Sequence, residues 1–436
     1  MVDDCFVSDI ENVVRLSSLP CHEEELSTSR WEELALKVRD LLIRSRRNDI
    51  KRLPYRSLIR LLIVICGCLG NELSTKKLTK CSKDLVTLAQ EILDHFVTSF
   101  GVPDVGGLLA MIVPGRSVKA TVFDHILLES TQCIARLSTD SSVNSLSMAP
   151  LFRDALIWAT SMVRFPVLCN GQQLSTLHPL SLQLIGDYRC QLKMLGLRVL
   201  LRLAQEVVVA FWRMTGRAEA TLETLTCQRS THSENAQIVE LTCSSISALI
   251  SLLEPAPKKR WYSKFMDNLL CDLALETLLD KKIVLQRYVL TLVDVLGQEV
   301  LIHSRRLLKA AELSLLAPRA PPYKGEVHSQ EHESFLLQLN TLSKYVRLAA
   351  DRLSPDIFSM VLPILIAFVD LEWNRKGIDL NALSMENIAH VIVEIVEELA
   401  AIDAVILRDT LNMCTELSPS TRSVLYKSTS ASSCEL

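Results

Sequence analysis

Histidines and cysteines are the residues of this chain most able to bind a metal or act as catalytic groups. The sequence has nine histidines and thirteen cysteines. No histidine pair forms an HExxH motif and no CxxC pairs with a second CxxC, so the local spacing of a zinc site is missing. Cys66 and Cys68 have the wrong spacing for zinc or redox chemistry, and His328 and His332 follow a proline-rich stretch that cannot continue a helix. We therefore expect structural or surface roles for the histidines and no metal site.

Motifs for phosphate binding and for nucleophilic catalysis are also missing from the sequence. There is no GxGxxG, no GxxxxGK[ST] and no GxSxG. Neighbouring carboxylates such as Glu397 and Glu398 lie on the polar face of a predicted helix, where water solvates them. The sequence thus predicts a protein without cofactor or catalysis, although distant residues can still converge in the fold.

The elements that would position any such residues are predicted to be helices. The chain has 436 residues, which is too long for one compact core, since single cores stop growing near roughly 250–300 residues. Hydrophobic residues make up 49% of it, whereas only 13 glycines and 15 prolines occur, too few for the many turns of an all-β protein. Two or three domains, or one elongated repeat array, fit this composition.

Apolar residues recur at three- and four-residue steps along most of the chain. Residues 385–399 show the pattern well, with Ile388, Ile392 and Val396 on one face and glutamates on the other. Further helices are predicted at 31–47, 55–69, 83–100, 117–137, 152–165, 191–212, 236–253, 261–279, 283–296, 299–315, 333–352 and 355–370. Short Gly- and Pro-containing connections between them predict antiparallel neighbours. The predicted fold class is all-α, an irregular HEAT-like α-solenoid of stacked helix pairs.

Four polar stretches divide the predicted helices. They are 138–150, 215–235, 317–329 and 418–436, rich in Ser, Thr, Pro or charge. They suggest an N-terminal helical block at 1–137, a linker at 138–150, a HEAT-like region at 151–415 and a disordered tail at 416–436. The segment 215–235 is expected to be a long exposed connection.

The charge balance and the apolar runs limit the partners. The net charge of −3 argues against nucleic acid as the main partner, since phosphate binding needs a concentrated basic surface. The longest apolar runs, 61–70 and 360–369, are shorter than the roughly 20 residues of a membrane span. No secretory signal opens the sequence, and several cysteines fall in apolar helical patterns, so we expect reduced thiols in the cytoplasm or nucleus. Pro257-Lys258-Lys259-Arg260 is a weak nuclear-import signal and reads better as a solvated turn.

The segment from Val163 to Ala204 has the most specific pattern in the chain. It contains Arg164-Phe165-Pro166, then Asp187-Tyr188, then Lys193 and Gly196. In this combination the segment resembles the TELO-two-interacting protein two family. Gln330-Glu331 before a leucine-rich helix is a second match, in pattern more than in identity, and the resemblance spans roughly residues 150–400. In many HEAT repeats such a carboxylate and a basic residue bridge neighbouring repeats, so Asp187 is expected to pair with Lys193.

The resemblance implies a helical-repeat scaffold that joins TELO-two and Tti-one type subunits in the TTT (Triple T) co-chaperone complex. That complex works with the ninety-kilodalton heat-shock chaperone to mature and stabilise phosphatidylinositol-kinase-related protein kinases, which govern the DNA-damage response and growth signalling. The family has no catalytic residue or cofactor to carry over to this chain. It implies instead a large apolar surface that is left exposed when the chain is alone.

A candidate partner surface lies in the C-terminal part of the predicted solenoid. Large apolar side chains on two predicted helices, with one aromatic residue beyond the first of them, are candidates for it: Phe358, Phe368, Trp373, Ile392 and Val396. The alternative for each of them is ordinary core between repeats, because most apolar positions of a helix are core.

Two other readings of the whole chain remain. An unrelated HEAT or armadillo adaptor, for example in nuclear transport, would carry regular repeats with a polar or acidic groove. A helical enzyme acting on an isoprenoid would need acidic DDxxD motifs, which the sequence lacks.

Overall fold

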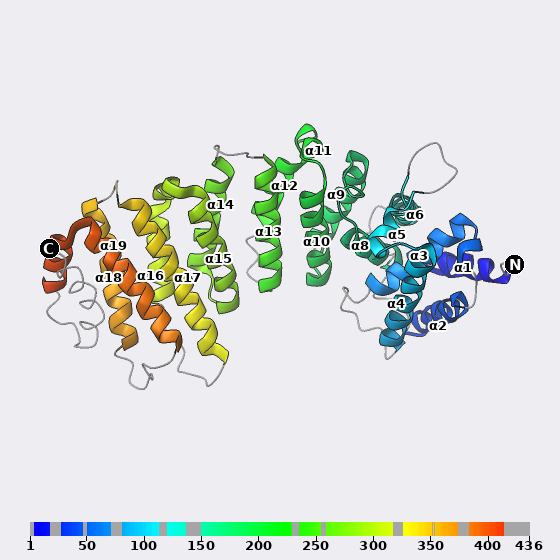
Figure 1. Cartoon of the computed structure of the whole chain (residues 1–436), viewed down its shortest axis with the longest axis horizontal. Helices are drawn as coiled ribbons and strands as arrows, with labels where there is room; N and C mark the ends of the chain where they lie inside the picture. Colours follow the sequence, from blue (N-terminus) through cyan, green and yellow to red (C-terminus); the bar gives the residue numbers. More distant parts are fainter. Residues whose placement is uncertain are drawn as a thin grey trace. The chain divides into compact units, whose positions relative to one another are not determined.

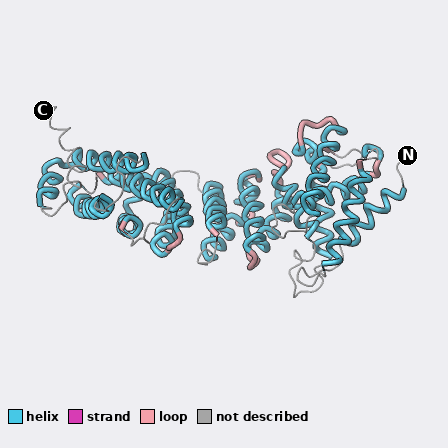
Figure 2. The backbone as a smooth tube through the Cα atoms, turned by 90° about the horizontal axis from the view of Figure 1, so that it is seen from below, coloured by secondary structure: helices cyan, strands magenta, loops and turns pink. Residues whose placement is uncertain are grey.

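The structure is a computed structural model, and it is built of α-helices. It describes residues 4–17, 28–46, 50–70, 81–112, 120–136, 150–228, 235–253, 259–316, 326–350, 352, 354–373 and 383–413. Within these ranges it contains no β-strand, and its one β-bridge joins Ile112 to Thr121. Figure 2 shows the same arrangement of helices joined by short loops. The all-α prediction is confirmed.

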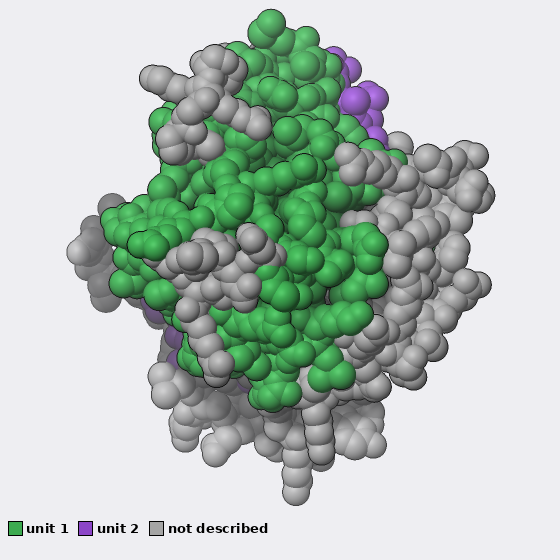
Figure 3. All heavy atoms as spheres, turned by 90° about the vertical axis from the view of Figure 1, so that its right-hand side faces the viewer, with its two compact units in different colours: residues 1–218 green, residues 219–436 purple. Residues whose placement is uncertain are grey.

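The chain forms two compact units, Met1–Ala218 and Glu219–Leu436, coloured separately in Figure 3. The division falls at residues 218 and 219 and not at the expected linker 138–150, of which residues 138–149 lie outside the described residues. The helix that follows that stretch packs on α3 and α6 of the N-terminal block. The block and the first part of the expected repeat region therefore share one unit.

Unit 1 is arranged around the contact between α3 and α8 (Figure 1). Its helices are α1 Asp4–Ser17, α2 Thr28–Ser45, α3 Tyr55–Gly70, α4 Cys81–Phe100, α5 Val105–Ala110, α6 Val122–Arg136, α8 Pro150–Met162, α9 Gly171–Ile185, α10 Cys190–Glu206 and α11 Val209–Met214, with a 3-10 helix at Ile50–Arg52. Gly70 lets α3 approach α8 closely, because a β-carbon there would lie 2.4 Å from the carbonyl oxygen of Asp154. α9 and α10 form an antiparallel pair, and α10 also packs on α8.

Unit 2 stacks its helices in two layers. Its helices are α13 Ala236–Leu253, α14 Arg260–Leu275, α15 Leu279–Leu296, α16 Ser304–Leu315, α17 Glu326–Ala349, α18 Ser354–Trp373 and α19 Leu383–Met413, with a 3-10 helix η3 at Gly297–His303. α13, α15, α17 and α19 follow one another in the first layer, and α14, α16 and α18 in the second. In Figure 1, α15, α17 and α19 stand side by side. This alternation is the packing of a helical-repeat stack. α12, Arg217–Gln228, lies across the division between the units.

Ion pairs join successive helices of the first layer of unit 2. Lys344 on α17 pairs with Asp294 on α15 at 2.5 Å, and Arg347 one turn further reaches Glu394 and Glu398 on α19. A buried polar contact, Gln286 with Gln338 across α15 and α17, lies inside the same layer. Exposed pairs of this kind contribute at most about 1 kcal/mol each, so they fix the register of neighbouring helices more than they stabilise the unit.

Several predicted elements differ from the structure. The expected exposed connection 215–235 contains α12, whose Ala218, Leu222 and Leu225 are buried, so that prediction is wrong. α9, α1 and α5 were not predicted, and the helix predicted at 191–212 ends at Glu206 before the short α11. α17 begins at Glu326, inside the expected loop 317–329. Residues 317–325 of that loop and the expected tail 418–436 lie outside the described residues.

Candidate protein-binding surface in unit 1

A tight turn connects α8 to α9 and carries the first group of motif residues. The carbonyl oxygen of Arg164 accepts hydrogen bonds from the amides of Val167 (2.8 Å) and Leu168 (3.1 Å). Val163 and Leu168 point into the core, while the Phe165 ring is 64% exposed and Pro166 is also exposed. The turn thus anchors its two ends and presents Phe165 to solvent.

Glu206, the last residue of α10, holds this turn in place. Its carboxylate accepts a hydrogen bond from the Phe165 amide at 2.9 Å and pairs with Arg202 at 3.2 Å and Arg164 at 4.0 Å. We did not single out Glu206 from the sequence. Its position at the end of a predicted helix is the sequence feature that could have indicated it. A glutamate there interacts unfavourably with the negative end of the helix dipole, so an ion-pair or hydrogen-bond partner elsewhere in the fold is expected.

The start of α9 is fixed by a capping box. Asn170 and Gln173 exchange hydrogen bonds between side chain and backbone, which satisfies amides that the helix leaves free. The buried Gln173 also donates to Asp124 Oδ1 on α6 and to the carbonyl oxygen of Val167, each at 2.8 Å. One side chain thereby ties α9 and the motif turn to α6.

Asp187 lies in the turn between α9 and α10, as the sequence suggested. Arg189 is a basic partner of this carboxylate, and its Nε donates to Oδ1 at 2.9 Å. Lys193, the expected partner, lies half-buried on α10, and its pairing with Asp187 stays a prediction. Burial raises the pKa of Asp187, but the hydrogen bonds and charge of Arg189 and the charge of Arg153 on α8 outweigh it, so the pKa lies below its ordinary value. Asp187 is therefore held as a carboxylate among arginines of its own turn and of the neighbouring helix.

Tyr188, next to Asp187, is exposed at the same turn. Its side chain is 80% accessible, and the Arg189 guanidinium lies 5.6 Å from its ring centre. The ring of Tyr188 therefore faces mostly solvent, with the Arg189 guanidinium over it.

Gly196 has a packing role. A β-carbon there would lie 2.7 Å from the carbonyl oxygen of Ser181 and 2.8 Å from both the amide nitrogen of Ile185 and Leu184 Cβ. Two of these three atoms are α9 backbone, which cannot rotate away. Glycine at this position allows α10 to lie directly against α9.

His178 on α9 is buried beside Trp212 of α11. Their rings meet edge to face, with centres 5.5 Å apart. Burial, and then the charge of Arg217, lowers the pKa of His178 to about 4. The imidazole is neutral near pH 7 and belongs to the core.

Exposed apolar side chains gather at the end of unit 1 where the motif turn meets α10. We call Met162, Phe165, Val208 and Val209 the Phe165 patch; all four are exposed. The turn that carries Phe165 lies beside the residues after α10, because the Phe165 amide donates to Glu206 and the Val208 amide donates to the carbonyl oxygen of Cys169. Exposed aromatic and aliphatic residues in one place are typical of a surface that binds protein.

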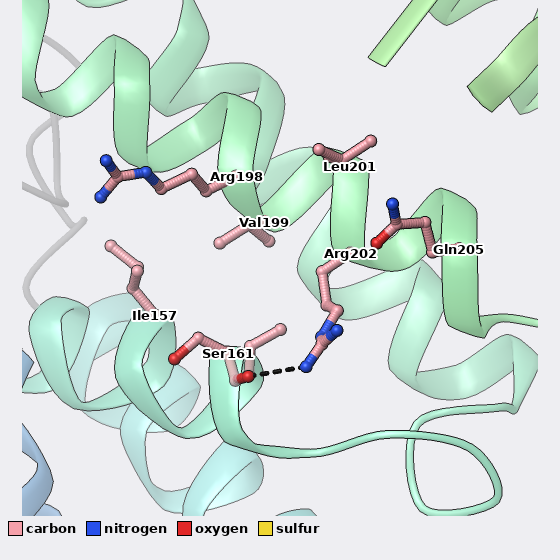
Figure 4. A pocket seen from close by; sticks show the side chains of 8 residues that line it. Ile157, Ser161, Arg198, Val199, Leu201, Arg202 and Gln205 are labelled. Carbon is pink, nitrogen blue, oxygen red and sulfur yellow. Dashed lines mark hydrogen bonds between the residues drawn. The ribbon is translucent and has the colours of Figure 1, made fainter. Parts of the chain in front are cut away.

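An open groove of about 280 Å³ runs between α8 and α10 toward this patch. Figure 4 shows Ile157 and Ser161 of α8 on one side and Arg198, Val199 and Arg202 of α10 on the other. Arg202 crosses it to donate to the carbonyl oxygen of Ser161 at 2.8 Å, the dashed line in the figure. The groove therefore has an aliphatic floor and a basic side.

The candidate partner surface in unit 2 is wrong for the four residues whose side chains are described. Phe358 and Phe368 on α18 and Ile392 and Val396 on α19 are all buried. Phe368 packs on Phe335 of α17 with ring centres 5.2 Å apart, and Ile392 and Val396 lie on the buried face of α19. These side chains fill the space between neighbouring helices, which is the core alternative. The side chain of Trp373 lies outside the described residues.

Folding brings together one constellation that local spacing did not reveal. His303 in η3 lies with Nε2 2.9 Å from Ser263 Oγ and Nδ1 2.9 Å from Asp267 Oδ1, both on α14. This is the order of a serine-hydrolase triad. However, Asp267 Oδ1 also accepts a hydrogen bond from Arg306 at 2.6 Å. The Ser263 amide donates to the carbonyl oxygen of Lys259, so this amide is not available to bind an oxyanion. We interpret the contact as a link between α14 and the turn before α16.

The cysteines whose side chains the structure describes are free thiols, and three of them are buried: Cys66, Cys133 and Cys243. Burial raises the pKa of Cys68 to about 12 and that of Cys66 further, so these thiols stay protonated and unreactive near pH 7. Cys271 was expected, with the three buried cysteines, at an apolar helix position, but it is exposed on α14, so that expectation is wrong for it. Within the described ranges, no group of three or more His, Cys, Asp or Glu side chains is placed to hold a metal ion.

Among the described helices, α13 is the one that is long and apolar enough to cross a membrane. Its buried residues, such as Ile238 and Leu249, lie on a helix that packs against α14 and α15. A core helix of a repeat stack has the same composition. In the basic run 257–260, Lys259 donates to the carbonyl oxygen of Leu296 at 2.7 Å, so this ammonium is engaged in the fold.

Comparison with known proteins adds no identification. No protein-family model matches the chain, and no curated protein matches it in sequence. The motif residues and the surface they form are therefore the features of this chain that bear on its function.

Proposed function

We propose that the chain is a non-catalytic scaffold subunit of the TTT co-chaperone complex that binds Tti-one and TELO-two type subunits. In that role it works with the ninety-kilodalton heat-shock chaperone to mature and stabilise phosphatidylinositol-kinase-related protein kinases, in the cytoplasm and nucleus. Unit 1 supplies the binding surface, and the helix stack of unit 2 extends the scaffold.

One observation supports this proposal above the others. The residues that carry the family resemblance divide into two groups, one that shapes the α9–α10 pair and one that faces solvent. Gly196 and Asp187 belong to the first group. Phe165 and Tyr188 belong to the second, and exposed aromatic residues on a rigid frame are the kind that anchor protein interfaces. Two highly exposed aromatic side chains, one at each of the turns before and after α9, favour a protein partner.

Affinity purification from the chain's own cells at near-native expression tests the proposal. The tagged wild type is expected to recover Tti-one and TELO-two type subunits. Phe165→Asp and Tyr188→Asp should each reduce that recovery about tenfold or more, since an interface hot spot contributes roughly 2 kcal/mol or more.

Ile302→Asp is the matched control. Ile302 lies in unit 2 and is 80% exposed, the same as Tyr188, so this variant adds the same charge outside the motif. Its recovery of the two subunits should equal that of the wild type. Recovery of neither subunit by the wild type would contradict the proposal, and recovery of nuclear-transport factors in their place would favour the adaptor reading.

A further inference from the structure

The groove between α8 and α10 has basic groups without acceptors. Among the described residues, Arg198 has no hydrogen-bond or ion-pair partner. Arg202 uses its terminal nitrogens on Ser161 and Glu206, but its buried Nε donates to nothing. Arg198 therefore brings a half-exposed positive charge to the groove without an acceptor among the described residues, and a ligand that enters the groove can supply one.

None of the described residues that line the groove is a carboxylate, so Arg198 has no counter-ion there, whereas Arg202 is paired with Glu206. The nearest acidic residue on α10, Glu206, already serves Arg202, Arg164 and the Phe165 amide. Arg198 and Arg202 are four residues apart on one helix, so their like charges face the same groove and repel each other weakly. A ligand that brings carboxylates would reduce this repulsion and give Arg198 an acceptor.

The floor of the groove determines what kind of ligand carries those carboxylates. Ile157, Val199 and Leu201 are aliphatic, and no aromatic side chain is present to stack a base. The groove is open along its side, whereas a small molecule needs a site that encloses most of its surface. An amphipathic helix fits such a groove, with its apolar stripe on the floor and its acidic flank against the arginines.

We propose that the α8–α10 groove binds an amphipathic helix of a partner protein, with glutamate or aspartate side chains on the flank that faces Arg198 and Arg202. This proposal rests on the proposed function in one respect, that unit 1 binds a protein partner. The net charge of the chain is −3, which disfavours binding of an acidic ligand to the surface in general. Tighter binding of an acidic peptide than of a basic one would therefore indicate the arginines of the groove.

A pair of fluorescent helical peptides with the same leucine stripe tests this inference on the whole purified chain. One peptide has glutamates on both flanks of the stripe and the other has lysines. The glutamate peptide should bind at least about tenfold more tightly by fluorescence anisotropy, and more weakly as salt is added. Equal affinity for the two peptides, or saturable binding of neither, would overturn the proposal.

Arg198→Glu locates the binding. This side chain is half-exposed and has no partner among the described residues, so folding should be unaffected. It should weaken the glutamate peptide about tenfold, whereas Arg305→Glu, the same charge change at an exposed arginine of unit 2, should have less than a twofold effect. Equal effects of the two variants would assign binding to overall charge and refute the groove. The peptide assay does not use the natural partner. Failure of the glutamate peptide to bind would therefore refute the groove proposal alone, and recovery of Tti-one and TELO-two type subunits tests the proposed function separately.

Discussion

Gly196→Ala places one methyl group between α9 and α10. The new β-carbon would lie 2.7 Å from the carbonyl oxygen of Ser181 and 2.8 Å from the amide nitrogen of Ile185. Ordinary contacts begin near 3.4 Å, so the two helices must separate by several tenths of an ångström. Since α10 also packs on α8, the shift reaches the groove and the turn that Glu206 holds.

Two effects of opposite sign determine the magnitude. Overpacking at a tight contact costs about 1–3 kcal/mol. Replacing glycine by alanine inside a helix returns about 1 kcal/mol through helix propensity. We expect a net loss of about 1–2 kcal/mol in the free energy of unfolding of unit 1, because the contacting atoms are backbone.

Gly186→Ala is the matched control at the end of the same helix pair. Gly186 has right-handed backbone angles, and its β-carbon would meet nothing nearer than 3.5 Å. This variant should be neutral or more stable by up to about 1 kcal/mol, since alanine restricts the unfolded chain. Urea unfolding followed by circular dichroism measures both variants. If Gly196→Ala is as stable as Gly186→Ala, the close contact between α9 and α10 is wrong.

Three further predictions concern titration, catalysis and the ion pairs of unit 2. Because the pKa of His178 is lowered to about 4 in the folded chain and is about 6.5 when unfolded, the stability it supports is present above pH 6.5 and lost as the pH falls toward 4. Urea unfolding measures the free energy of unfolding at pH 7 and at pH 5. Between these two pH values the wild type should lose about 2 kcal/mol more than His178→Gln, and equal losses would contradict the lowered pKa of His178. A fluorophosphonate probe should leave Ser263 unlabelled, and labelling that depends on His303 would show a working nucleophile. His303→Ala should reduce the free energy of unfolding by about 1–3 kcal/mol and so lower the melting temperature, because it removes the hydrogen bonds to Ser263 and Asp267. Arg347→Glu should cost about 1 kcal/mol in low salt and less in 1 M salt, and a loss independent of salt would refute its ion-pair role.

Helical periodicity predicted most of the fold because it depends only on local spacing. On α19, Ile388, Ile392 and Val396 lie on the buried face as their three- and four-residue steps predicted. The helix continues beyond the predicted end, through a kink at Asp403, whose carboxylate caps the amides of Val405 and Ile406. Periodicity does not contain this information, because a side-chain cap restarts the helix there.

The missed helices show where local patterns fail. α9 contains Pro179 and several polar residues, and it is stabilised by the Asn170–Gln173 capping box and by contacts with α6 and α10. α12 has a Thr- and Glu-rich sequence that resembles a loop, but its leucines are buried. In both segments tertiary burial outweighs weak local propensity.

The candidate site was predictable only in part. Motif residues were recognised as a group, but which of them pack and which face solvent depends on helices distant in sequence, such as the Glu206 contact with Phe165. The same limit explains the error at Phe358 and Phe368, since an apolar helix position has the same sequence signal in a core as in an interface. Buried side chains of this kind need the neighbouring helix to be known.

Direct reconstitution tests the central claim that unit 1 presents a protein-binding surface for TTT subunits. Purified chain is mixed with purified Tti-one and TELO-two type subunits and passed over a size-exclusion column with light scattering. We expect a stable complex that contains the chain. Tyr188→Asp and Phe165→Asp should disrupt this complex, and Ile302→Asp should leave it intact. A chain that elutes alone in every mixture, or a complex that forms equally well with both motif substitutions, would refute this binding surface.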